Sequence, residues 1–232
     1  MINKRYKDIL SQYIHKGEPT PLTIGTLVVC GLCFLIIIIA TFTQLNFSHG
    51  WFKFVSDEGF ITYTKNVIYS PLIPAMIFTI YILGKNYATL MYILYLATGF
   101  FIWPIFLFGG GIDYVQNYLF GYILGFFFAI YTIGTILKIS QNVKYRLLSA
   151  LLGVISIHVF GFAYCIILAI LRVIDFSLVI PILKVISMSN ILYDILFSIL
   201  IILIAPYIKN ILWVCMKPKF DRKKSKNIGK RN

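Results

Sequence analysis

Residues 22–44 read LTIGTLVVCGLCFLIIIIATFTQ, an apolar run without a single charged side chain. About 20 such residues are enough for a helix to cross the ~30 Å hydrocarbon layer of a bilayer. The run is too long for the apolar segment of a cleaved signal peptide, and no small-residue cleavage site follows it. It therefore predicts a membrane-spanning helix that stays in the protein.

The composition of the whole chain points the same way. Of the 232 residues, 59% are hydrophobic and only 12% are charged. Soluble domains carry roughly 45–50% apolar and about 25% charged residues. The composition therefore excludes a disordered chain, argues against a soluble enzyme, and predicts an all-α membrane protein.

Five further apolar stretches have the length of a membrane span. They are Val67 to Gly84, Tyr87 to Phe108, Tyr118 to Leu137, Leu147 to Ile170 and Ser189 to Val214. Residues 171–188 are also apolar but carry Arg172, Asp175, Pro181 and Lys184, which favours an interfacial connector. We therefore expect six transmembrane helices in a domain of residues 22–214. A cytoplasmic segment, 1–21, precedes this domain, and a basic cytoplasmic tail, 215–232, follows it.

The charges give the six helices a direction. The chain has 21 Lys and Arg against 8 Asp and Glu. If both termini are cytoplasmic, all but four of the basic residues fall in inner segments, the exceptions being Lys53, Lys65, Arg172 and Lys184. Cytoplasmic loops collect Lys and Arg in this way, so the basic excess indicates membrane topology and not nucleic-acid binding. The prediction is a multi-pass membrane protein with both termini on the cytoplasmic side.

Small residues recur at intervals of four in two of the predicted helices. Gly121, Gly125 and Ala129 share one helix face, and Gly153 and Gly161 share a face of the next helix. Small residues allow helix backbones to approach closely inside a membrane. These faces are predicted to be packing seams within the bundle, with docking of a partner protein as the alternative for one of them.

Two polar residues inside the predicted spans stand out. Asp194 lies near the outer end of the sixth span and His158 near the middle of the fifth. A carboxylate in the membrane costs roughly 2.5–3.5 kcal/mol on insertion scales, so Asp194 should face the bundle interior or a wet cavity. It would serve there in ligand or ion binding, or in structural pairing. For His158 a hydrogen bond to a neighbouring carbonyl is the simpler reading.

Other polar, aromatic and glycine residues gather in the outer third of the predicted bundle, where the chain passes through Gly109-Gly110-Gly111. Apolar walls with a few placed polar groups are typical of small-ligand sites. Trp103 supplies a further flat apolar wall. The alternative to a ligand site is that this region is an ordinary irregular outer cap. The predicted substrate-binding residues are Asp194, Tyr122, Gly121, Asn117, Phe106, Gly109 and Gly110.

The chain lacks the sequence motifs of an energy source or of catalysis. It contains no Gly-x-x-x-x-Gly-Lys-Ser/Thr run for ATP, and no His-Glu-x-x-His or Gly-x-Ser-x-Gly motif. No metal site and no cofactor are predicted. A six-helix binder without a motor calls for a partner or for self-association. One alternative is an intramembrane enzyme that uses Asp194 and His158 as an acid/base pair, although their predicted depths differ. The other is a degenerate assembly partner that has lost transport.

Several short motifs between Tyr69 and Lys209, taken in order, resemble the BioY family. Residues 70–74 (SPLIP) resemble the family's proline-rich helix start, and residues 121–126 (GYILGF) match its Gly-Tyr-x-x-Gly-Phe motif. Gly99, Pro104, Phe106 and the glycines 109–111 match a third motif, with Ile102 where glycine is usual. The chain departs at 117–120 (NYLF), where the family has Gly-Pro-Thr-Gly. It also departs at Phe197, where the family's Asp-x-x-Lys motif has lysine.

The resemblance implies a function. BioY proteins are biotin-binding S components of energy-coupling factor (ECF) transporters. This chain is therefore expected to be the substrate-capture subunit of an ATP-driven vitamin importer, not an enzyme. The resemblance implies that Asp194 bonds the ureido ring of biotin, while Phe197 lacks the lysine charge used against the biotin carboxylate. The implied partners are a transmembrane coupling subunit and two ATPase subunits.

Overall fold

The structure, a computed structural model, describes residues 22–55 and 59–216. All of the predicted N-terminal segment, 1–21, and all but two residues of the basic tail lie outside this range. The first helix, α2 (Ile24–Phe42), corresponds to the apolar run at 22–44. Its N-cap is Thr23, whose side chain accepts a hydrogen bond from the Thr26 backbone N–H. The predicted anchor helix is therefore present, with a conventional capped start.

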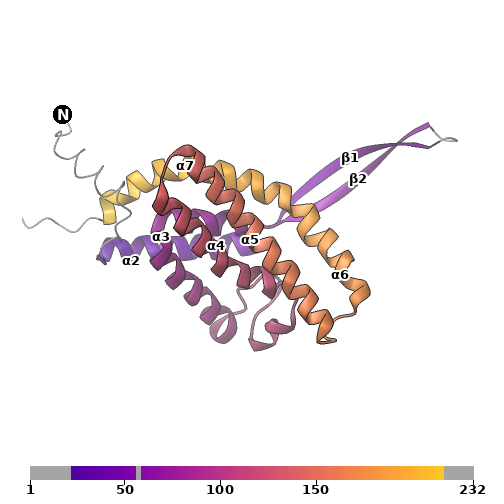
Figure 1. Cartoon of the computed structure of the whole chain (residues 1–232), viewed down its shortest axis with the longest axis horizontal. Coiled ribbons are helices and arrows are strands. Elements are labelled where there is room, and N and C mark those ends of the chain that lie inside the picture. Colours follow the sequence, from indigo (N-terminus) through magenta and orange to yellow (C-terminus); the bar gives the residue numbers. More distant parts are fainter. Residues whose placement is uncertain (1–21, 56–58, 217–232) are drawn as a thin grey trace, which may run out of the picture.

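A β-hairpin follows α2 and departs from the all-α prediction. Strands β1 (Leu45–Val55) and β2 (Gly59–Tyr69) pair antiparallel, with Leu45 opposite Tyr69. The hairpin projects from one end of the helical body (Figure 1). Residues 45–69 are rich in the aromatic and β-branched residues that favour strands. The second span was consequently predicted to start too early, at Val67, because the apolar end of β2 was read as helix.

The second and third predicted spans form a single kinked element. Helix α3 (Leu72–Ala97) continues into the π-helical turn Thr98–Ile102. Gly84 interrupts it with φ 74° and ψ 175°, outside the helical region. The candidate membrane spans of the described chain number five, by length and composition. Leu72–Ile102 counts as one of them and contains both limbs of α3.

The remaining helices complete the bundle. They are α4 (Phe120–Ile139), α5 (Val143–Ile170), α6 (Phe176–Leu183) and α7 (Ser189–Met216). A π-helical turn, Lys184–Met188, joins α6 to α7. The segment 171–188, predicted to be an interfacial connector, is therefore mostly helical. It extends the last candidate span to Phe176–Leu212.

The predicted glycine seams bring α4 and α5 together. A Cβ added at Gly125 would lie 2.8 Å from the Ile157 Cα of α5, closer than real side chains come. One added at Gly121 would lie 3.1 Å from the Gly161 Cα and closer still to Tyr164. The backbones can approach this closely only because glycine stands at these positions. The seams are internal packing surfaces.

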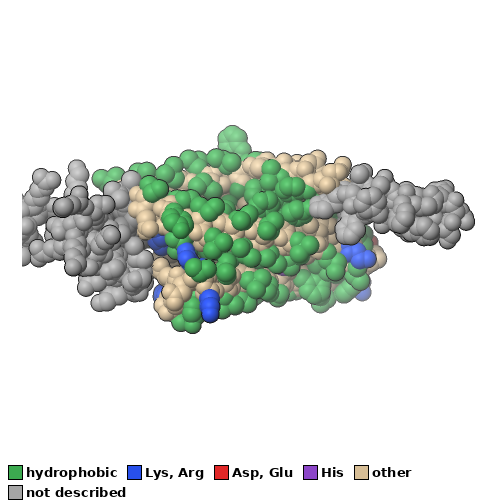
Figure 2. Space-filling view, turned by 90° about the horizontal axis from the view of Figure 1, so that it is seen from above, with side chains coloured by type: hydrophobic (Ala, Val, Ile, Leu, Met, Phe, Trp, Pro, Cys, Tyr) green, Lys and Arg blue, Asp and Glu red, His purple; other side chains and the backbone are tan. Residues whose placement is uncertain are grey.

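The first and the last described helix have their chain-terminal ends at the same end of the bundle. Helix α2 begins and α7 ends at the same end of the molecule, opposite the hairpin (Figure 1). At the end with the termini, the Lys209 ammonium donates to the Tyr81 carbonyl oxygen at 2.9 Å, and Lys85 lies over the Tyr131 ring. Apolar side chains cover much of the face in Figure 2, and the blue Lys and Arg side chains lie toward its two ends. This surface suits a bilayer.

The kink at Gly84 yields a stability prediction. Its φ of 74° and ψ of 175° are tolerated almost only by glycine, so Gly84→Ala should destabilise the protein by about 1–3 kcal/mol. Since no atom lies within 4 Å of the added Cβ, the loss would come from the backbone and not from a clash. The measurement is thermal unfolding of the purified protein in detergent.

Gly31→Ala is the matched control. Gly31 lies in α2 and also has open space around an added Cβ, but it is not among the positive-φ glycines. Alanine favours a helix over glycine, so this variant should be at least as stable as the wild type. Equal melting temperatures for Gly84→Ala and Gly31→Ala would contradict the strained-turn explanation.

Candidate functional site

A cavity lies between the base of the hairpin and the helices. Its volume is about 400 Å³, within the range of small-molecule sites. Most of its wall is apolar, and polar side chains are placed at a few points. Its lining residues are Gln44, Asn66, Val67, Ile68, Tyr69, Ser70, Leu72, Ile73, Leu107, Phe108, Tyr114, Tyr118, Leu119, Tyr122, Ile123, Phe126, His158, Val185, Ile186, Ser189, Asn190 and Asp194.

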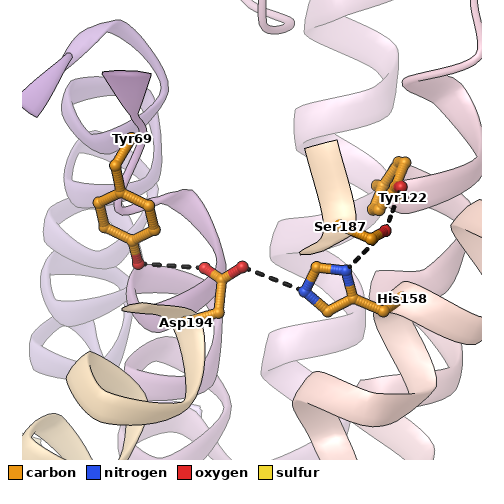
Figure 3. Close-up of polar contacts among 5 residues, drawn as sticks. All are labelled: Tyr69, Tyr122, His158, Ser187 and Asp194. Atoms are coloured by element: carbon orange, nitrogen blue, oxygen red, sulfur yellow. Dashed lines mark hydrogen bonds and ion pairs between the residues drawn. The ribbon is translucent and has the colours of Figure 1, made fainter. Parts of the chain in front are cut away.

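Asp194 of α7 is the acidic side chain among the residues that line this cavity. Its residue surface is only 2% exposed. The Tyr69 hydroxyl donates to Oδ1 at 3.0 Å, and His158 Nε2 lies 3.1 Å from Oδ2 (Figure 3). A buried carboxylate is tolerated only when it is paired and hydrogen-bonded, and both oxygens of Asp194 meet that condition.

The second nitrogen of His158 extends the network. Nδ1 lies 3.1 Å from the Ser187 hydroxyl, which is 2.6 Å from the Tyr122 hydroxyl. Figure 3 shows the five side chains in one continuous row from Tyr69 to Tyr122. The row joins β2, α7, α5, the turn before α7, and α4. Five separate chain segments are thus fixed to one another through polar contacts at the cavity wall.

Asp194 and His158, which were predicted to lie at different depths, are in direct contact, with His158 Nε2 3.1 Å from Asp194 Oδ2. Asp194 was placed near the outer end of its helix because the span was taken to begin at Ser189, whereas the candidate span of the structure begins at Phe176. His158 bonds the carboxylate of Asp194 and the hydroxyl of Ser187, where a neighbouring carbonyl was expected.

Tyr69, which the sequence did not single out, is held by aromatic packing. Its ring centroid lies 5.4 Å from that of Phe197 and 5.5 Å from that of Tyr193. Phe47 of β1 stacks on Tyr193 at 4.7 Å. Burial and the adjacent Asp194 carboxylate raise the pKa of Tyr69 well above its usual range, so its hydroxyl stays protonated and donates. Phe197 thus packs the base of the hairpin against α7.

Of the predicted site residues, Asp194 and Tyr122 line the cavity, and the other five are not among its lining residues. Gly121 packs against α5, and the Asn117 Oδ1 accepts the Leu119 backbone N–H at 2.9 Å. Phe106 is fully buried in an aromatic cluster.

The glycine turn is also taken up by packing within the protein. Gly109 pairs with Phe106 through an isolated backbone bridge, and a Cβ added to it would lie 3.4 Å from the Tyr114 ring. Gly110 packs against Pro104. Trp103, expected to be a wall of the site, is 67% exposed. The glycine turn therefore lies next to Tyr114, which lines the cavity, and does not line the cavity itself.

Several lining residues were not predicted from the sequence, although the positions of two of them, Asn190 and Tyr118, could have indicated them. Asn190 precedes Asp194 by four residues, which places both on one helix face. Tyr118 was noted at the start of a helix and lies in the wall beside Tyr122. No sequence pattern connected Tyr69 or Asn66 with Asp194. Within the described residues, no cluster of three or more His, Cys, Asp or Glu could hold a metal ion.

The fold and the cavity define a mostly helical membrane protein with a cavity of small-molecule size and a buried carboxylate in the cavity wall. The BioY family model matches residues 18–213, so the chain belongs to the BioY family. This confirms the resemblance found in the sequence and supports the prediction of a transporter subunit and not an enzyme.

A solved structure gives the same fold. It is the crystal structure of the S-component for biotin from an ECF-type ABC transporter. The likeness has a TM-score of 0.57 and 21% sequence identity, and it covers 82% of this chain and 95% of the other. At this identity the likeness establishes the fold alone. No curated protein matches the sequence.

The bond from Tyr69 to Asp194 predicts a stability effect. Tyr69→Phe removes the donor but keeps the ring packing, so a buried carboxylate oxygen loses a partner. We expect a loss of about 1–3 kcal/mol in the free energy of unfolding. The measurement is thermal unfolding in detergent, with Tyr207→Phe as the control because Tyr207 is 72% exposed. Equal melting temperatures for the two variants would show that the bond contributes nothing measurable.

Proposed function

We propose that the chain is the substrate-capture (S) subunit of an ECF-type importer and binds biotin or a similar small vitamin from the outer face. The observation that carries the proposal is the 400 Å³ cavity with Asp194 buried in its wall. Membership in the BioY family and the fold shared with the S-component for biotin support the same ligand.

The chemistry of the cavity suits a bicyclic urea. A carboxylate offers about four acceptor positions, and the bonds to Tyr69 and His158 occupy two of those of Asp194. Asp194 can therefore accept a ureido N–H without losing its existing partners. Tyr122, Tyr118 and Phe126 supply apolar wall for the fused rings.

The acid end of biotin needs a different partner. Phe197 stands at the family's lysine position, and the lining residues include no Lys or Arg. Gln44 and Asn66, which are exposed side chains at the base of the hairpin, also line the cavity. Their amide N–H groups can donate to a carboxylate there. We propose that the rings lie near Asp194 and that the acid points toward Gln44 and Asn66.

The proposed topology has six crossings and both termini on the cytoplasmic side of a bacterial inner membrane. The two limbs of α3 count as separate crossings in this proposal, in a membrane domain of residues 22–214. The shared end of α2 and α7, and the contacts of Lys85 and Lys209 at that end, support it. The hairpin and the cavity beside it then face outward.

Asp194→Ala should weaken biotin binding by about a hundredfold, since a bond to a charged acceptor is worth roughly 1.5–3 kcal/mol. The measurement is titration calorimetry on protein in detergent, together with the rise in melting temperature that biotin causes. Asp175→Ala is the matched control, because Asp175 is exposed ahead of α6. Unchanged affinity in Asp194→Ala would remove Asp194 from the site. A wild type that no vitamin stabilises would instead favour a degenerate assembly partner.

The proposed partners are a membrane coupling subunit and two ATPase subunits, which makes a second prediction. The chain alone in liposomes should bind biotin but not accumulate it above the external concentration, with or without enclosed ATP. Radiolabelled uptake measures this, and liposomes that also contain the coupling and ATPase subunits are the positive control. Energised uptake by the chain alone would overturn the partner model.

A further inference from the structure

We propose that Asn190 is a specificity-determining residue that reads the ureido ring of the ligand through a pair of hydrogen bonds. This inference rests on the proposed function, because it assigns a contact to the same ligand. In this arrangement Asn190 Oδ1 accepts one ring N–H and its amide nitrogen donates to the ring carbonyl, while Asp194 accepts the other ring N–H.

The first support is an unused acceptor. Asn190 lines the cavity, and its Oδ1 atom is buried without a hydrogen-bond partner. A buried carbonyl oxygen without a partner costs about 1–3 kcal/mol, so most such groups in proteins are satisfied. A residue of the cavity wall whose side-chain oxygen lacks a partner in the empty protein is suited to a donor that arrives with the ligand.

The second support is the position of Asn190 relative to Asp194. Residues four apart on a helix lie on the same face, with Cβ atoms about 5–6 Å apart. Both side chains line the same cavity. A five-membered cyclic urea carries two N–H groups on either side of one carbonyl, so a ring placed between the two side chains can bond both of them at once.

The third support is chemical complementarity. One edge of a cyclic urea presents an N–H donor beside a carbonyl acceptor, and a primary carboxamide presents the reverse pair. Such two-bond pairing fixes orientation as well as affinity, as asparagine does with the edge of adenine. Asp194 alone cannot recognise the ring carbonyl, because a carboxylate only accepts hydrogen bonds and the carbonyl needs a donor. Asn190 therefore adds recognition of the ring carbonyl.

The test compares biotin with 2-iminobiotin, in which a nitrogen donor replaces the ring carbonyl oxygen. In the full-length protein, Asn190→Leu keeps a similar volume and removes both polar atoms. It should weaken biotin binding at least about tenfold. Asn190→Asp is nearly isosteric and offers acceptors only, so it should weaken biotin and favour 2-iminobiotin. The ratio of the two Kd values should shift toward 2-iminobiotin by at least about tenfold.

Asn210→Leu and Asn210→Asp are the matched controls, because Asn210 is exposed on the same helix far from the cavity residues. Neither should change the ratio. If Asn190→Leu does not fold, the ratio measured with Asn190→Asp still decides. Wild-type binding of biotin with an unchanged ratio in Asn190→Asp would overturn this inference and leave the proposed function standing. A wild type that does not bind biotin would overturn both.

Discussion

The buried carboxylate of Asp194 is the constraint on which the rest of the structure depends. An unpaired charge in an apolar interior is so unfavourable that the fold must bring partners to it. Tyr69 and His158 come from segments far apart in the sequence, and each bonds one oxygen. These two bonds connect the base of the hairpin and the middle of α5 to α7.

The same bonds shape the site. His158 reaches Ser187, and Ser187 reaches Tyr122, so the turn before α7 and the start of α4 are also fixed. Four of these five side chains line the cavity: Tyr69, Tyr122, His158 and Asp194. The polar groups of the cavity wall are therefore held in place by hydrogen bonds to one another, and under the proposed function a ligand meets acceptors that are already oriented. Preorganisation of this kind lowers the entropic cost of binding.

The sequence predicted what depends on local composition. The apolar run at 22–44, the glycine seam at Gly121 and Gly125, and the interior position of Asp194 each follow from residue type and spacing. The contact between His158 and Asp194 does not, because it depends on how α5 and α7 pack against each other. Residues 176–188 form helix despite Pro181 and Lys184, so the last helical stretch begins earlier than predicted. The hairpin was missed because aromatic-rich strands and apolar helix ends look alike over a few residues.

Phe197 stands where the resemblance to the family implies lysine, and this bears on the proposed recognition of the ligand. Its aromatic ring packs against Tyr69 at the base of the hairpin, so this position supports a residue of the cavity wall and supplies no charge. Among the described lining residues, the charged or readily charged groups other than tyrosine are Asp194 and His158, and these bond each other. Under the proposed function, an anionic tail gains little from the interior and points toward the exposed amides of Gln44 and Asn66. The same proposal assigns selectivity to the ring end, where Asp194 and Asn190, with its unpaired oxygen, lie on one helix face.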